Sequence, residues 1–182
     1  MNDKKYKIAV FGLGSAEIKE ANEGDAFALG ELIAGRGHYL ITGLAKGVTQ
    51  FASKGAKSKG GVVIGISPNN SEDEISTDVC YDNTDIIIST GLGDRGRNVI
   101  SVRTCDGMIV INGSMGVLNE ITNGVGENKP IVILRGSGGV ADVAEMVMEA
   151  LKPDYKYFSM VDDVKKAVDV LEDLITRKAQ QR

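Results

Sequence analysis

The chain alternates between short apolar runs and longer segments with helical periodicity. The apolar runs, rich in β-branched residues, lie at 7–12, 38–42, 61–67, 84–90, 107–111 and 130–134, with a shorter one at 157–161. Each run is continuously apolar rather than alternating, which is typical of strands that are covered on both faces. We therefore predict a sheet of six to seven buried strands.

Segments with helical periodicity lie between most of these strands. In the clearest one, Val48, Phe51, Ala52, Gly55 and Ala56 share one face at the i, i+3, i+4, i+7, i+8 spacing. Other helices are predicted around 27–33 and at 97–105, 116–127, 139–151 and 162–178. The alternation of strand and helix predicts an α/β fold, with a mostly parallel sheet, helices on both faces and right-handed crossovers.

The composition is that of an ordinary globular protein, and it argues against nucleic acids and membranes as partners. Its 182 residues contain no visible domain boundary, so we expect a single domain over 1–182. The net charge of −4 leaves no basic block to neutralise the phosphates of a nucleic acid. No apolar run approaches the roughly 20 residues of a membrane span, and the start, MNDKKYKIAVFG, has no secretory apolar core. We expect a cytoplasmic, soluble protein with no nucleic-acid or membrane partner.

The segment 67–83, SPNNSEDEISTDVCYDN, is polar, acidic and rich in asparagine. A solvated surface loop is the simplest interpretation. A lid or a subunit contact is the alternative, and the sequence leaves that choice open.

Glycine is the unusual residue, with 23 among 182 residues, nearly twice the usual ~7%. Four clusters follow predicted strands and precede helices: GLGS (12–15), TGLAKG (42–47), NGSMG (112–116) and RGSGG (135–139). In a parallel sheet these loops open at the carboxyl edge, where open α/β folds bind ligands. Their backbone N–H groups and the helix N-termini behind them attract anions. One cluster alone would equally suit a tight turn, but four at one edge indicate a phosphate-bearing ligand.

Several common kinds of site are disfavoured by the residues present. GLGSAE begins like a dinucleotide fingerprint but has Glu17 in place of the third Gly or Ala, and the second strand ends in Thr42 rather than an acid. No GxxxxGK[ST] motif of a P-loop NTPase occurs. The single histidine, His38, begins a strand at the opposite edge, so a serine hydrolase would lack its base. Cys80 and Cys105 are expected to be reduced structural residues, and no Cys/His cluster indicates a metal site.

Arg97 and Glu120 are two charged residues that each follow a predicted strand. Arg97 begins the helix after strand 84–90, and Glu120 lies one turn into the helix after strand 107–111. If those two strands are neighbours, both side chains reach the same edge of the sheet. A surface ion pair for Arg97 and a solvated helix acid for Glu120 are the simplest interpretations of each residue alone.

The span RNVISVRTCDGMIVINGSMGVLNE (97–120) resembles the LOG (LONELY GUY) family, formerly called lysine decarboxylases. That family has an Arg-Lys pair, an Asp that opens a strand, and then P-G-G-x-G-T-x-x-E. Arg97, Asp106, Gly113, Gly116 and Glu120 fall in register with this pattern. The resemblance continues over 42–68 and 128–139 and so covers most of the chain. It looks closest to the bacterial and archaeal branch grouped with molybdenum-cofactor carrier proteins.

The resemblance implies a Rossmann-like three-layer sandwich that forms a homodimer or higher homo-oligomer and binds a nucleoside monophosphate. In active members the ligand phosphate lies on the PGGxGT loop, and the arginine and glutamate serve cleavage of the N-glycosidic bond to base and ribose 5-phosphate. The candidate catalytic residues are therefore Arg97 and Glu120. A carboxylate beside the sugar can stabilise an oxocarbenium-like state or activate water, and a planar guanidinium can hold phosphate or ribose oxygens.

The glycine loops supply the candidate phosphate- and ligand-binding residues. These are Gly12, Gly14, Ser15, Thr42, Gly43, Gly47, Asn112, Gly113, Ser114, Met115, Gly116 and Val117. No cofactor is expected to be required. An AMP-like nucleotide or molybdopterin is the bound molecule that the resemblance suggests.

The chain departs from the family pattern within this loop. Asn112 stands at the family's proline, Ser114 at its second glycine, Val117 at its threonine, Asn119 at its first glutamate and Asn98 at the lysine after the arginine. Val117 removes a hydroxyl expected near phosphate, and Ser114 either restores one or crowds the loop. Two functions stay open: a nucleoside 5′-monophosphate phosphoribohydrolase, and a non-catalytic molybdenum-cofactor carrier or nucleotide sensor. Lysine decarboxylation is disfavoured, because no lysine lies in a recognisable pyridoxal-binding context.

Overall fold

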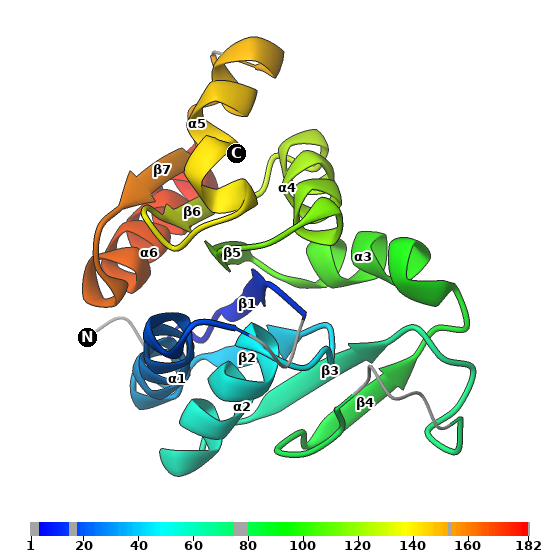
Figure 1. Cartoon of the computed structure of the whole chain (residues 1–182). Helices are drawn as coiled ribbons and strands as arrows, with labels where there is room; N and C mark the ends of the chain where they lie inside the picture. The colour runs from blue at the N-terminus through cyan, green and yellow to red at the C-terminus, as the bar shows by residue number, and fades with distance from the viewer. Residues whose placement is uncertain (1–3, 15–17, 75–79, 153, 182) are drawn as a thin grey trace.

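The computed structural model describes residues 4–14, 18–74, 80–152 and 154–181 (Figure 1). Its strands are β1 (Lys7–Gly12), β2 (Tyr39–Thr42), β3 (Val63–Ser67), β4 (Ile86–Ser89), β5 (Gly107–Ile111), β6 (Ile131–Leu134) and β7 (Phe158–Val161). Its helices are α1 (Glu20–Gly35), α2 (Val48–Ser58), α3 (Gly93–Thr104), α4 (Met115–Gly126), α5 (Val140–Leu151) and α6 (Val164–Gln180). Every predicted strand is present, including the short seventh one.

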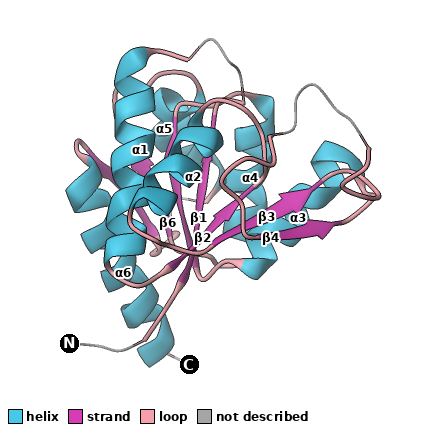
Figure 2. Ribbon diagram, turned by 90° about the horizontal axis from the view of Figure 1, so that it is seen from below, coloured by secondary structure: helices cyan, strands magenta, loops and turns pink. Residues whose placement is uncertain are grey.

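The strands form one sheet in the order β4-β3-β2-β1-β5-β6-β7, and all six neighbouring pairs are parallel. Helices cover both faces of the sheet (Figure 2). The predicted α/β, Rossmann-like three-layer sandwich is therefore confirmed, with seven strands. The chain moves outward from β1 to β4 and then returns to the centre, so β1 and β5 lie side by side where the order of the strands reverses.

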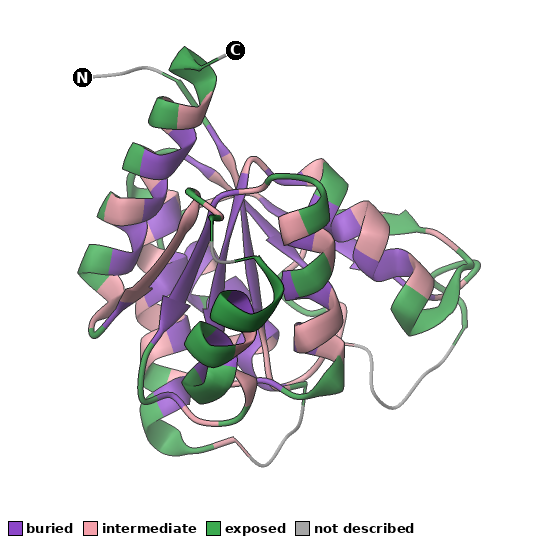
Figure 3. Ribbon diagram, turned by 90° about the horizontal axis from the view of Figure 1, so that it is seen from above, coloured by how far each residue is buried: buried purple, intermediate pink, exposed green. Residues whose placement is uncertain are grey.

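Continuously apolar strands fill two hydrophobic layers, one on each face of the sheet. Alternate strand residues pack against α1, α2 and α6 on one face and against α3, α4 and α5 on the other. All of β5 and all of β6 are buried, as expected for strands covered on both sides. Figure 3 shows buried residues along the central strands and exposed residues on the outer turns of the helices.

The outermost strand, β4, differs from the sequence-based expectation. Its run of three isoleucines predicts a strand covered on both faces, but Ile86 and Ile88 are 49% and 41% exposed. Among the described strands, β4 pairs only with β3. An apolar run therefore identified the strand but not its position at the edge.

No helix in the described part of the chain is long and apolar enough to cross a membrane. Both cysteines are free, and Cys105 is buried. His38 is also buried and lies at the edge of the sheet where β2 begins. Its Nδ1 accepts from the backbone N–H of Tyr6 (3.2 Å), and its Nε2 lies 2.7 Å from Glu172 Oε1.

Candidate functional site

A cleft of about 820 Å³ opens at the carboxyl edge of the sheet, over the point where the strand order reverses. Loops that follow β1, β2, β3, β4 and β5 all contribute to its walls. The residues that line it are Phe11, Gly12, Leu13, Gly14, Gly43, Ala45, Thr49, Pro68, Asn69, Asn70, Glu74, Gly91, Gly93, Asp94, Arg95, Arg97, Asn98, Ser114, Gly116, Val117 and Glu120. Open α/β sheets bind ligands at this position because the loops diverge there.

The loops after β1 and β2 form one wall of the cleft, and they are glycine-rich because the backbone is crowded. A Cβ atom on Gly12 would lie 2.5 Å from the carbonyl oxygen of Ile111 and from Cγ1 of Val48. Gly14 and Gly43 also line the cleft. Gly47, the residue just before α2, has a φ of 72° and does not reach the cleft. Ser15, predicted as a ligand-binding residue, lies outside the described residues.

Thr42 lies beneath this wall rather than in it. It is fully buried at the end of β2, and its Oγ1 has no hydrogen-bond partner among the described residues. Nε of Arg97 is likewise buried and unpaired in the described part of the chain. Buried polar atoms normally have partners, so the floor of the cleft keeps unused hydrogen-bonding capacity.

The loop between β5 and α4 forms the opposite wall and is held by the loop after β6. Asn112 has a φ of 59°, a conformation that asparagine tolerates and proline cannot adopt. Its N–H donates to Ser137 Oγ (2.7 Å), and its Nδ2 donates to the carbonyl oxygen of Ser137 (2.9 Å). The RGSGG cluster thus supports this loop from behind and does not line the cleft.

Within this loop the predicted residues divide into three groups. Ser114, which precedes α4 and is exposed, and Gly116 in its first turn line the cleft. Val117 also borders it but is 3% exposed and packs where a Cβ on Gly113 would stand. Met115 is 70% exposed and points elsewhere, and Asn112 and Gly113 shape the loop without lining the cleft.

Arg97 and Glu120 form a buried ion pair in the cleft, with Arg97 Nη1 donating to Glu120 Oε1 over 3.2 Å. The sequence predicted that these residues meet if the strands before them are neighbours. That condition is wrong, because three strands separate β4 from β5. They meet because α3 runs back from the outer strand β4 towards the central strand β5 and packs against α4. The guanidinium lies directly over Gly43, where any Cβ would overlap it.

Burial dominates the electrostatics of Glu120. Its side chain is 7% exposed, and the resulting desolvation raises its pKa from 4.5 to about 7, against the opposing effect of Arg97 and, more weakly, of Arg95. A carboxyl group with a pKa near neutrality can both take up and release a proton under physiological conditions. Glu120 therefore has the proton affinity of a general acid or base.

Three neighbouring features of the cleft are not apparent from the sequence. Arg95 is exposed at the mouth of the cleft, 3.0 Å from a Cβ placed on Gly116, and makes no ion pair with the described residues. Asn98 Nδ2 donates to Asn119 Oδ1 (2.9 Å), so the two positions where the family pattern has a lysine and a glutamate contact each other as a neutral pair. The third feature is the first part of the predicted surface loop, because Pro68–Asn70 and Glu74 line the cleft.

The sequence matches the SLOG cluster4 family over residues 5–168, and the chain belongs to this family. An uncharacterised protein of Archaeoglobus fulgidus is 40% identical over 132 residues, which cover 72% of this chain and 82% of that protein. Among solved structures, the molybdenum cofactor carrier protein of Chlamydomonas reinhardtii is 31% identical, with a TM-score of 0.80, covering 95% of this chain and 99% of that one. The molybdenum cofactor binding protein of Rippkaea orientalis is 28% identical, with the same TM-score and the same coverage.

Proposed function

We propose that this protein binds a phosphate-bearing small molecule of nucleotide type in the cleft at the carboxyl edge of its sheet. The observation that carries the proposal is the convergence of three features on one cleft: the glycine loops, the N-terminus of α4, and Arg95, which forms no ion pair with the described residues. Backbone N–H groups at a helix N-terminus favour a phosphate. A guanidinium adds a planar, charged donor.

The Arg97–Glu120 pair supports hydrolysis of such a ligand when the sugar lies between the two glycine walls. In this reaction Glu120, as the carboxylate, takes a proton from water while the water oxygen bonds to C1′. The N-glycosidic bond breaks, and its electron pair leaves with the base. The base gains a proton from solvent, and Glu120 returns the proton it took from water to solvent. The products are free base and ribose 5-phosphate, without a cofactor.

A molybdenum-cofactor carrier is the second candidate. It is supported by the similarity to carrier and binding proteins from two organisms over nearly the whole chain. The β5–α4 loop also favours it, because Val117 is buried against Gly113 and offers no hydroxyl to a phosphate. A carrier needs the cleft and the phosphate loop but not a reactive carboxyl group.

Chromatography of AMP and other nucleoside 5′-monophosphates, incubated with the purified protein and with Glu120→Gln, separates the two candidates. Free base released by the wild type and not by the variant identifies a phosphoribohydrolase. No release by either protein, together with co-purified pterin fluorescence or molybdenum, identifies the carrier. A protein that binds no nucleotide, pterin or molybdate contradicts the whole proposal.

We further propose that the protein is cytoplasmic and assembles as a homodimer or higher homo-oligomer. The support for assembly is an apolar stripe on the outer face of α5, which consists of Val143, Met146, Val147, Ala150 and Leu151. Met146 and Leu151 are 70% and 68% exposed. Such a stripe is typical of a helix that packs against another apolar surface.

A further inference from the structure

The wall of the cleft that is formed by the segment after β3 differs chemically from the glycine-rich walls. Side chains with amide and carboxylate groups border it, contributed by Asn69, Asn70 and Glu74. The backbone of Gly91, after β4, supports this wall, since a Cβ there would lie 2.5 Å from Asn70 Oδ1. The segment after β3 thus approaches the loop after β4 closely, while the side chains of Asn70 and Glu74 stay exposed.

Hydrogen bonds hold this wall in place. Asn69 Nδ2 donates to the carbonyl oxygen of Glu74 (3.1 Å) and to Tyr81 Oη (3.1 Å), and the N–H of Gly91 donates to the carbonyl oxygen of Asn69 (2.9 Å). These bonds join the segment after β3 to the loop after β4. Groups held in this way lose little further freedom when a ligand binds.

Glu74 presents a fixed carboxylate on this wall. Asn70 donates to it twice, from its backbone N–H to Oε2 (3.0 Å) and from Nδ2 to Oε1 (2.6 Å). These two bonds lower the pKa of Glu74. Each carboxylate oxygen can accept a further hydrogen bond, and Glu74 forms no ion pair with the described residues. The group is therefore an available anionic acceptor.

The position of this wall orients a ligand along the cleft. β3 lies two strands from β1 and three from β5, which is about 10–14 Å at the usual spacing of strands. Glu74 repels a phosphate, whereas Arg95 and the N-terminus of α4 attract one. A ligand that spans the cleft therefore places its phosphate near α4, its middle near Arg97 and Glu120, and its other end at Asn69, Asn70 and Glu74.

We propose that Asn69, Asn70 and Glu74 bind the 2-amino-4-oxopyrimidine edge that guanine and pterins share. This inference rests on the proposed function and names its ligand class. The edge carries a ring N–H beside an exocyclic amino group, two parallel donors that match the two oxygens of one carboxylate. Adenine offers no such pair, because its amino group is beside a ring acceptor, and hypoxanthine lacks the amino group.

The test compares GMP with IMP, which differs by that amino group alone, by isothermal titration calorimetry at 4 °C, with intact GMP verified by chromatography. The wild type is expected to bind GMP about fivefold to tenfold more tightly than IMP. Glu74→Gln should remove most of this preference. Glu72→Gln, a neighbouring exposed acid that does not line the cleft, should keep it. Pterin and pteridin-4-one, which also differ by that amino group alone, form the second arm and tell a nucleotide from a pterin ligand.

Ribose 5-phosphate separates this inference from the proposed function. If ribose 5-phosphate, AMP, IMP and GMP bind equally, or if Glu74→Gln keeps the preference for GMP, the inference is wrong while the phosphate site stands. If ribose 5-phosphate and every monophosphate and pterin fail to bind, both are wrong. A preference for GMP and for pterin that Glu74→Gln removes, with unchanged binding of ribose 5-phosphate, supports both.

Discussion

Glu120 shows how strongly one residue depends on its surroundings. In the sequence it is one acid among 25, and a solvated helix position is its simplest interpretation. Folding buries it beside Arg97 in a cleft, where desolvation raises its pKa to about 7. Removing one partner of a buried pair leaves an unpaired charge, so each member holds the other in place.

This raised pKa predicts a pH-dependent stability. The folded state binds the Glu120 proton more tightly than the unfolded chain, whose carboxyl titrates near 4.5. Ionisation therefore lowers the free energy of unfolding as the pH rises through the window from about 4.5 to 7. Between pH 5 and 8 the wild type should lose on the order of 3 kcal/mol relative to Glu120→Gln.

Urea unfolding of both proteins across this pH range measures the difference. Glu149→Gln, which changes an exposed acid on α5, should parallel the wild type at every pH. Parallel curves for wild type and Glu120→Gln would show that Glu120 titrates normally in the folded protein.

The sequence indicated Arg97 and Glu120, which line the cleft, but not the packing that brings them together. The register of Arg97 and Glu120 with a known pattern indicated both residues, although adjacent strands are not the reason why they meet. Asn69, Asn70 and Glu74 had no such signal, because polar residues in an acidic loop look the same whether they face solvent or a cleft. Arg95 was likewise indistinguishable from an ordinary surface arginine.

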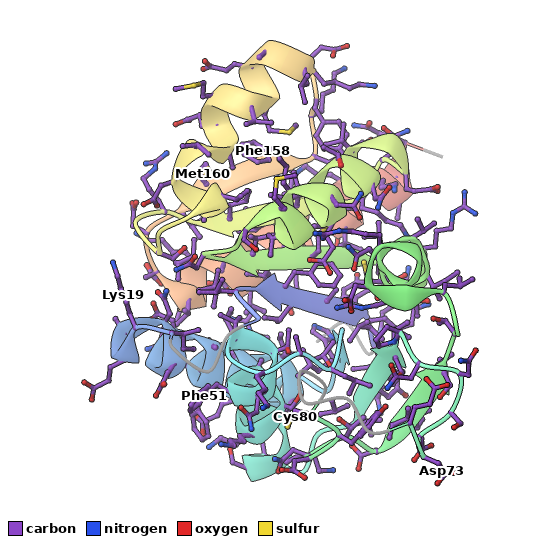
Figure 4. All side chains as sticks on the ribbon, turned by 45° about the vertical axis from the view of Figure 1, so that its right-hand side comes forward. Lys19, Phe51, Asp73, Cys80, Phe158 and Met160 are labelled. Carbon is purple, nitrogen blue, oxygen red and sulfur yellow. The ribbon has the colours of Figure 1, made fainter. Side chains whose placement is uncertain are left out.

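Among the elements, α1 and α2 pack closely against each other. Their axes approach until Gly30 contacts the backbone of Ala52 and Gly55 contacts the backbone of Phe27, so a Cβ on either glycine would overlap a carbonyl oxygen. This contact positions the start of α2 and, through it, the glycine loop after β2. Figure 4 shows Phe51 on the outer side of α2 and Lys19 at the start of α1.

Gly55→Ala should therefore destabilise the protein, by about 1–3 kcal/mol for an overpacked interface. Gly24→Ala is the matched control on α1, because a Cβ there meets nothing within 4 Å, and it should be neutral or stabilise by about 0.5–1 kcal/mol. Urea midpoints at constant pH measure both changes. Equal effects of the two substitutions would show that the helices can separate without loss.

Elements of secondary structure were predictable where the pattern is local. All seven strands follow from apolar runs, and the predicted α4 begins one residue later than the observed one, at Gly116 instead of Met115. The start of α3 was predicted at Arg97 but lies at Gly93, because two glycines in its first turn look like a loop. The edge position of β4 could not be predicted, since the order of strands depends on contacts between distant segments.

At the scale of the whole molecule, two exposed apolar surfaces stand out among the described residues. One is the stripe on α5, which projects from the body of the protein (Figure 1), and the other is the outer strand β4 with Ile86 and Ile88. On its inner face α5 packs through Ala141, Ala144 and Met148, with Phe158 and Met160 of β7 beneath it (Figure 4). The helix is thus apolar on two sides. A surface helix that packs on one side only usually has a polar outer face.

Self-association through α5 makes a sharp prediction. Met146→Lys places a charge at the middle of the stripe, where it would be desolvated against a second copy, so the assembly should dissociate towards a monomer of 19.3 kDa. Ile88→Lys makes the same kind of change on β4 and should leave the assembly intact. Size-exclusion chromatography with light scattering measures the mass of each. Dissociation by Ile88→Lys alone would show that the interface lies on β4, and a monomeric wild type would contradict assembly altogether.

Because the cleft lies within one chain, the monomeric Met146→Lys variant should still bind ribose 5-phosphate, which separates loss of assembly from loss of the site.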